Sequence, residues 1–141
     1  MDALGIESLD EGALVLVDTA PIIYVLEGHA RFAERFAPLF ARHEAGTLRL
    51  AVSTVTLSEV LAGPLSAGEE AIARRYRAML ESWGVVDFTA DIAEQAARAR
   101  ARYRLKLPDA IQLASALAIN ADALATHDRA FGKVRGIRVI A

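Results

Sequence analysis

The chain has 141 residues, of which 54% are hydrophobic and 24% are charged, and its mean hydropathy is +0.28. This composition is too apolar for a disordered chain, and the length suits one domain with a sizeable core. The absence of cysteine excludes disulfides, thiolate metal sites and a cysteine nucleophile. The net charge of −2 and a pI near 5.9 do not mark the whole chain as a nucleic-acid binder, although 14 of its 16 basic residues are arginine.

Short apolar runs alternate with helical segments along the chain. The predicted strands cover residues 13–17, 48–52, 85–88, 123–126 and 137–140. The predicted helices cover residues 21–28, 30–45, 54–62, 68–83, 90–104 and 108–120. The third of these helices is predicted to end at Gly63-Pro64. This alternation predicts a doubly wound α/β domain, with a parallel sheet covered by helices on both faces.

The sequence shows no internal repeat, low-complexity segment or linker. We therefore expect a single domain over residues 1–141, with residues 1–12 forming a loosely ordered N-terminal extension. No apolar stretch approaches the roughly 18 residues that a membrane span requires. The first twelve residues carry no basic residue ahead of an apolar run, so no secretory signal is expected, and we expect a cytoplasmic location.

Four acidic residues fall where chemistry gathers in such a fold. Asp18 ends the first predicted strand, and Asp128 lies just beyond the fourth. Asp109 follows Pro108 in the first turn of a helix, and Glu59 lies in a short helix after the second strand. Because the carboxyl ends of parallel strands meet at one edge of a sheet, we expect these carboxylates to lie together. Carboxylate oxygens are the ligands that Mg²⁺ and Mn²⁺ prefer.

Each acid also has an ordinary structural explanation. Asp109 suits a helix start through the helix macrodipole. Asp18 is placed to cap the helix that follows it, and Asp128 suits a turn. Glu59 is harder to explain in this way, because an unpaired carboxylate on a short apolar helix is costly.

Taken together, four sequence segments resemble the PIN-domain ribonucleases, and most closely the VapC-type toxins of bacterial toxin–antitoxin pairs. The segments are VDTAPIIYVLEG, STVTLSEVLAG, LKLPDAIQLASALA and LATHDRAFGKVRGIRVI, which extend from about Leu14 to Ile140. The resemblance implies a three-layer α/β/α sandwich with a central parallel sheet. It also implies a cytoplasmic homodimer that is held inactive by a cognate antitoxin protein.

The same resemblance implies roles for individual residues. The acidic set that binds the metal ion and carries out catalysis would be Asp18, Glu59, Asp109 and Asp128. Thr126 matches a hydroxyl residue that supports the last acid, and Thr19 matches the residue after the first. The implied activity is endoribonuclease cleavage of RNA that depends on Mg²⁺ or Mn²⁺, with the ion activating water and offsetting charge on the phosphate.

One departure from the family pattern concerns Ala20, where many members carry Asn or Ser. The loss of a polar group at this position keeps an alternative open. In that alternative the chain is a catalytically inactive PIN domain that binds RNA or a protein partner. Retention of all four acids favours the enzyme.

Two further groups of residues are candidate binding surfaces. The run from Arg98 to Lys106 contains no acid, and contact with RNA phosphates, a solvated helix face and contact with an acidic partner all explain it. Its candidate substrate-binding residues are Arg98, Arg100, Arg102 and Arg104. Phe32, Phe36 and Phe40 recur at helical spacing, which suits core packing or a protein interface.

Other chemistries fail on the residues present. The glycine spacing of Gly63 and Gly68 fits a phosphate-binding loop, but Glu69-Glu70 stand where Lys and Ser or Thr are needed. The three histidines do not form a zinc set, although His127 lies beside Asp128. A phosphoacceptor receiver domain needs paired acids after its first strand, and a haloacid-dehalogenase-like phosphatase needs an Asp two residues after the first Asp. This chain meets neither requirement.

Overall fold

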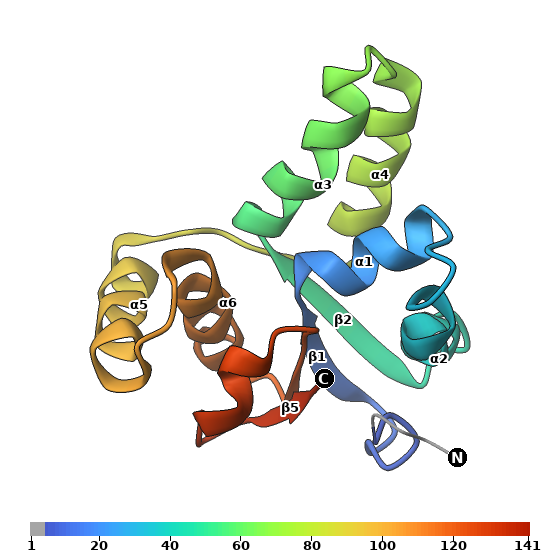
Figure 1. Ribbon diagram of the computed structural model, residues 1–141. Helices are drawn as coiled ribbons and strands as arrows, with labels where there is room; N and C mark the ends of the chain where they lie inside the picture. The colour runs from blue at the N-terminus through green and yellow to red at the C-terminus, as the bar shows by residue number, and fades with distance from the viewer. Residues whose placement is uncertain (1–4) are drawn as a thin grey trace.

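The five strands form one parallel sheet in the order β3-β2-β1-β4-β5 in the computed structural model, which describes residues 5–141 (Figure 1). The strands are β1 (Ala13–Val17), β2 (Leu48–Ser53), β3 (Val85–Val86), β4 (Ala123–Ala125) and β5 (Arg138–Ile140). β1 lies at the centre and pairs with β2 on one side and β4 on the other. The predicted parallel α/β sheet is confirmed.

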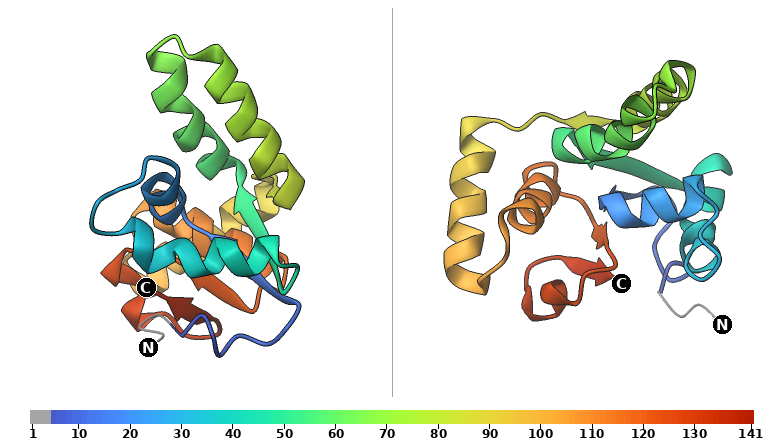
Figure 2. Two further views of the ribbon diagram at one scale, coloured as in Figure 1. Left: turned by 90° about the vertical axis from the view of Figure 1, so that its right-hand side faces the viewer. Right: turned by 45° about the horizontal axis from the view of Figure 1, so that its top comes forward.

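Helices cover both faces of this sheet. They are α1 (Thr19–Leu26), α2 (Ala33–Glu44), α3 (Thr54–Ser66), α4 (Glu70–Trp83), α5 (Ala90–Tyr103) and α6 (Leu107–Ala118), with a 3₁₀ turn η1 (Arg129–Lys133). Figure 2 shows α5 and α6 on the opposite side of the sheet from α1 and α2, with α3 and α4 forming a hairpin that extends beyond it. This is the three-layer α/β/α sandwich that the resemblance implied.

Alternating side chains of β1 separate two hydrophobic cores. Val15 and Val17 point into the core formed with α1 to α4, where Phe36 and Leu80 are fully buried. Leu16 points into the other core, which α5, α6 and η1 complete. The central strand is therefore buried on both faces, which is why it reads as a continuous apolar run.

Polar residues at strand ends start the helices that lead into the site. The Asp18 side chain caps α1 by accepting from the backbone N–H of Thr19. The Ser53 side chain, at the last position of β2, caps α3 by accepting from the N–H of Thr56. Because β2 passes directly into α3, the first turns of that helix lie at the carboxyl edge of the sheet.

Several predicted boundaries are wrong, among them those of α3 and β3. The helix expected over residues 54–62 continues to Ser66 and contains Pro64. A proline costs a helix one backbone hydrogen bond, and here α3 ends two residues later, so its last turn tolerates the loss. The strand expected over residues 85–88 covers only Val85–Val86, and Phe88 is exposed.

Residues 1–4 of the predicted N-terminal extension lie outside the described residues. In the remainder, residues 5–12 form turns that place Ile6 and Leu9 in the core beside β1. Arg42 of α2 donates hydrogen bonds from Nη1 to the carbonyl oxygens of both residues, at 2.8 and 3.0 Å. Along residues 5–141, no helix combines the length and apolar character needed to cross a membrane.

Candidate functional site

The four predicted acids come from four different elements and line one pocket of about 910 Å³ at the carboxyl edge of the sheet. Asp18 follows β1, and Asp128 lies three residues beyond β4. Glu59 projects from α3, and Asp109 lies in the first turn of α6. The parallel topology therefore assembles a negatively charged pocket from segments that are distant in sequence.

Asp18 is the most strongly anchored of these carboxylates. Its Oδ1 accepts from the Thr19 N–H at 2.8 Å and from Gln112 Nε2 at 3.1 Å, and its Oδ2 accepts from Thr126 Oγ1 at 2.9 Å. Burial raises the pKa of Asp18, and these three hydrogen bonds oppose the rise without cancelling it. The Asp18 carboxylate is thus held in one orientation at the base of the pocket.

Thr126 forms hydrogen bonds to both Asp18 and Asp128. Its hydroxyl donates to Asp18 and accepts from the backbone N–H of Asp128 at 3.0 Å. The resemblance implied support for the last acid, and the structure adds a direct bond to the first. Because Thr126 is fully buried, this hydroxyl fixes the spacing between the two segments.

A chain of buried hydroxyl and amide groups orients Glu59. The Thr19 hydroxyl donates to Glu59 Oε1 at 3.1 Å and lies 3.0 Å from the Thr56 hydroxyl. Because the single hydroxyl hydrogen of Thr19 goes to Glu59, Thr56 donates to Thr19. Gln112 Nε2 in turn donates to Thr56 at 2.6 Å, and Ser53 donates to Gln112 Oε1 at 2.8 Å. This series of hydrogen bonds ends at the Glu59 carboxylate. The exposed Glu59 therefore has a hydrogen-bond partner rather than an apolar environment.

Asp109 and Asp128 repel one another across the pocket. Burial raises the pKa of Asp109 to about 6, together with repulsion by Asp128, a hydrogen bond to Asp128 and repulsion by Asp18, and Lys106 partly offsets this. The site therefore concentrates more negative charge than its own hydrogen-bond donors neutralise.

The donor set fits a hard divalent cation such as Mg²⁺. Within residues 5–141 there is no group of three or more His, Asp or Glu side chains arranged as a ready metal cluster. Mg²⁺ is commonly held by one or two carboxylates and keeps several waters, so it does not need such a cluster. A cation bound here would relieve the repulsion that Asp109 experiences from Asp128 and Asp18.

Aromatic and basic side chains line the pocket beside the acids. The rings of His127, Tyr24 and Phe32 contact one another, and His127 Nδ1 is 2.8 Å from the Tyr24 hydroxyl. Burial lowers the pKa of His127, and repulsion by Arg35, Arg129 and Arg31 lowers it further. His127 is therefore a neutral, partly buried part of the pocket wall near pH 7.

The predicted arginine run lies elsewhere. Arg98 pairs with Glu94 on the exposed face of α5, and Arg100 donates to the Leu105 carbonyl oxygen. Arg102 lies over the Tyr103 ring, and Arg104 ends the helix in a left-handed conformation. None of the four arginines lines the carboxylate pocket.

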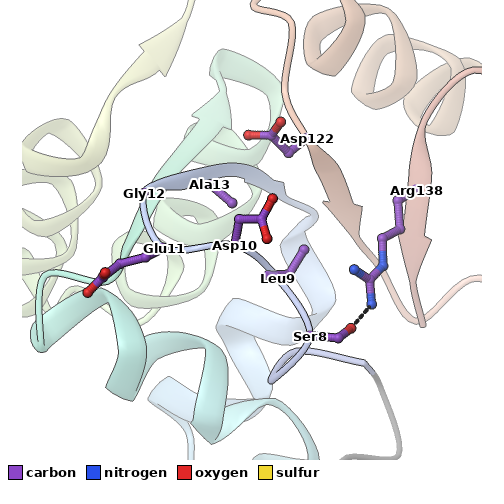
Figure 3. A pocket seen from close by; sticks show the side chains of 8 residues that line it. All are labelled: Ser8, Leu9, Asp10, Glu11, Gly12, Ala13, Asp122 and Arg138. Carbon is purple, nitrogen blue, oxygen red and sulfur yellow. Dashed lines mark hydrogen bonds between the residues drawn. The ribbon is translucent and has the colours of Figure 1, made fainter.

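A second pocket of about 400 Å³ lies at the opposite edge of the sheet (Figure 3). Its polar groups are engaged within the protein, since Asp122 Oδ2 accepts from the Leu14 N–H at 2.8 Å and Arg138 donates to Ser8 and Gly5. None of the predicted site residues lies there.

Sequence reasoning missed Ser53, Thr56 and Gln112. Gln112 is 1% exposed and contacts Asp18, Thr56 and Ser53 at once. One signal was available, because Gln112 lies three residues after Asp109 on an otherwise apolar helix and so shares a face with it. A buried amide at that position needs polar partners.

Comparison with known proteins agrees with this geometry. The PIN domain family model matches residues 15–137. The chain belongs to the PIN-domain family, whose members are nucleases. A comparison with curated proteins found no match.

Several solved structures share this PIN fold. A toxin–antitoxin complex from Klebsiella pneumoniae is 30% identical, with a TM-score of 0.72 over 90% of this chain and 96% of that one. Mycobacterium tuberculosis VapC20, described as a sarcin–ricin loop cleaving toxin, is 21% identical, with a TM-score of 0.66 over 90% and 99%. Rickettsia felis VapBC2, bound to a promoter DNA fragment, is 17% identical, with a TM-score of 0.68 over 89% and 96%. The last two likenesses concern the fold alone.

Proposed function

We propose that this PIN domain is a Mg²⁺- or Mn²⁺-dependent endoribonuclease and the toxin of a toxin–antitoxin pair. The observation that carries the proposal is the meeting of Asp18, Glu59, Asp109 and Asp128 in one pocket, with the pKa of Asp109 raised to about 6. Such crowding of like charges is costly and is typical of a site built for a cation.

Asp18 and Asp109 would hold the ion, and Asp128 and Glu59 would contribute directly or through water. When bound, the ion supplies activation of a water molecule and offsets charge on the scissile phosphate. The chain's own groups prepare the site. Thr126 and Gln112 fix the carboxylate of Asp18. This fixed geometry lowers the reorganisation needed during reaction.

The likeness to the Klebsiella complex supports a protein antitoxin as partner. A homodimer and a cytoplasmic location also belong to the proposal, since a toxin that cuts cellular RNA acts where that RNA is. RNA contacts by Arg98, Arg100, Arg102 and Arg104 stay a prediction. Size-exclusion chromatography with light scattering measures the oligomeric state directly.

Ala20 favours the second candidate, an inactive PIN domain that binds RNA or protein. It lines the pocket and presents a methyl group where many relatives carry a polar side chain. Two carboxylates and water suffice for Mg²⁺, so we give the enzyme precedence.

The deciding experiment is incubation of the purified chain, freed of copurifying partners, with total RNA in Mg²⁺, Mn²⁺ or EDTA. We expect discrete cuts that need metal, disappear in Asp18→Asn and persist in Asp10→Asn, an exposed acid at the opposite edge of the sheet. Cuts that survive in Asp18→Asn would point to a contaminant or to another site. RNA binding without cuts in any metal would favour the inactive module.

A further inference from the structure

The pocket that holds the carboxylates also has a wall of rings and guanidinium groups that the proposed metal chemistry does not use. This aromatic–arginine wall consists of Tyr24, Phe32, His127, Arg31, Arg35 and Arg129, all of which line the pocket. Arg31 and Phe32 lie between α1 and α2, and Tyr24 and Arg35 lie within those two helices. His127 and Arg129 lie between β4 and β5. The wall therefore lies beside the acids without belonging to them.

Phe32 is the central ring of this wall. It lies 4.3 Å from the His127 ring and 5.1 Å from the Tyr24 ring, measured between centroids. Unlike Phe36 and Phe40 on the same helical stripe, Phe32 belongs to neither hydrophobic core of the described chain. It is a partly exposed aromatic surface whose position is fixed by neighbouring rings.

The three arginines give the wall a positive charge. Arg31 lies 5.2 Å from the centroid of the Phe32 ring. The guanidinium groups of Arg31, Arg35 and Arg129 all act on His127, so they converge on one region. In residues 5–141, the salt bridges join Arg77 to Glu81 and Arg98 to Glu94, and neither involves the wall. Arg35 donates one hydrogen bond to the Ala141 carbonyl oxygen at 2.7 Å.

We propose that the aromatic–arginine wall binds one or two unpaired nucleotides of a single-stranded RNA next to the scissile phosphate. A base stacks on Phe32, and the flanking phosphates contact the arginines. The inference rests on the proposed nuclease function and names the substrate class that the pocket takes. Single strands are favoured over duplex because a base can stack on a protein ring only when it has left its own helix.

Charge also favours RNA as the occupant. The carboxylates repel a polyanion, and the arginines of the aromatic–arginine wall offset that repulsion where the strand enters. The run Arg98–Lys106 cannot do this for the pocket, because none of its four arginines lines it. An acidic protein segment would match the arginines but would leave the stacked rings unexplained.

The test measures binding by the full chain in EDTA, using fluorescence anisotropy of a labelled single-stranded RNA 12-mer, its duplex and polyglutamate. Phe32→Leu should weaken binding of the single strand about tenfold, within the range for loss of one stacked base. Phe40→Leu is the matched control, since Phe40 lies within α2, whose N-cap is Phe32, but packs against Trp83. Duplex RNA should bind more weakly than the single strand and respond little to Phe32→Leu.

The arginines are tested by salt dependence. Arg31→Gln with Arg35→Gln should reduce the slope of log K against log salt by about 1.4, the value for two contacts to a single strand. Arg74→Gln with Arg75→Gln, two exposed arginines on α4, is the control and should leave the slope unchanged. A larger loss in Arg98→Gln with Arg102→Gln would overturn the proposal in favour of the α5 run.

Other outcomes separate this inference from the proposed function. Wild-type chain that binds no RNA, or equal effects of Phe32→Leu and Phe40→Leu, overturns the aromatic–arginine wall. Equal binding of polyglutamate, lost in the same variants, would make the wall a protein-docking surface instead. If the single strand binds through Phe32 but is not cut in Mg²⁺ or Mn²⁺, the nuclease proposal fails while the nucleotide subsite stands.

Discussion

Replacement of Asp109 by Asn should make the metal-free protein more stable near neutral pH. Asp109 faces repulsion from Asp128 and Asp18 as well as partial burial, and together they raise its pKa to about 6. A carboxyl whose pKa is higher in the folded state than its ordinary 3.8 binds its proton more tightly when folded. The contribution of Asp109 to wild-type stability is therefore greatest below about pH 4 and falls as the pH rises through 6. Asn removes the charge that causes this loss.

The size of the effect follows from the same shift. A difference of about two pKa units corresponds to about 3 kcal/mol between the two protonation states. Because the Asp109 side chain is partly exposed, solvent screening reduces this to about 1.5 kcal/mol. Loss of a carboxylate from the first turn of α6 costs about 0.5 kcal/mol. The variant should thus gain about 1 kcal/mol near pH 7.5, or about 3 °C in Tm.

The assay is thermal unfolding in EDTA, followed by far-UV circular dichroism at about pH 7.5 and about pH 4.5. The gap between variant and wild type should close at the lower pH, where Asp109 is protonated. Mg²⁺ should raise the Tm of the wild type more than that of the variant, since binding of a ligand to the folded state alone is stabilising. Asp10→Asn should follow the wild type throughout. An Asp109→Asn protein that is less stable at neutral pH, or a gap equal at both pH values, would refute the reasoning.

Three further substitutions test the surrounding structure. Gln112→Leu should lower the free energy of unfolding in urea by about 2 kcal/mol because its partners lose their bonds, whereas the exposed Gln95→Leu should change it by less than about 0.5 kcal/mol. Thr126→Val should cost about 1.5 kcal/mol and raise the pKa of Asp18 further, measured by NMR titration. Arg104→Gly should raise the Tm by about 2 °C, since Arg104 has a φ of 55°; no rise would argue against strain there.

The layers of this fold could be predicted because strong local patterns coincide with the elements. The apolar run at residues 13–17 is the central strand, and its ending at Asp18 marks where the chain turns into α1. Such patterns lose information at the three phenylalanines of α2 and its N-cap. Phe36 is fully buried, Phe40 packs against Trp83, and Phe32 lines the pocket, although all three share one helical spacing. The helical spacing predicts that the three rings share one face of the helix. The position of each ring relative to the sheet edge determines which residues it contacts.

The acids of the site were predictable because they follow recognisable strand and helix boundaries. Gln112 was not, because its partners Asp18 and Ser53 lie 94 and 59 residues away in sequence. No local pattern records such contacts. The arginines of the pocket could not be predicted for a related reason. Arg31, Arg35 and Arg129 are scattered in the sequence, whereas the dense arginine run on α5 does not line the pocket.

The bond between Thr126 and Asp18 also sets an order of events during synthesis. The two residues are 108 positions apart, so translation at about 5–20 residues per second separates their appearance by roughly 5–20 s. Thr126 in turn donates its backbone N–H to the carbonyl oxygen of Ile140. The acidic pocket therefore cannot assemble until the segment up to Ile140 has left the ribosome.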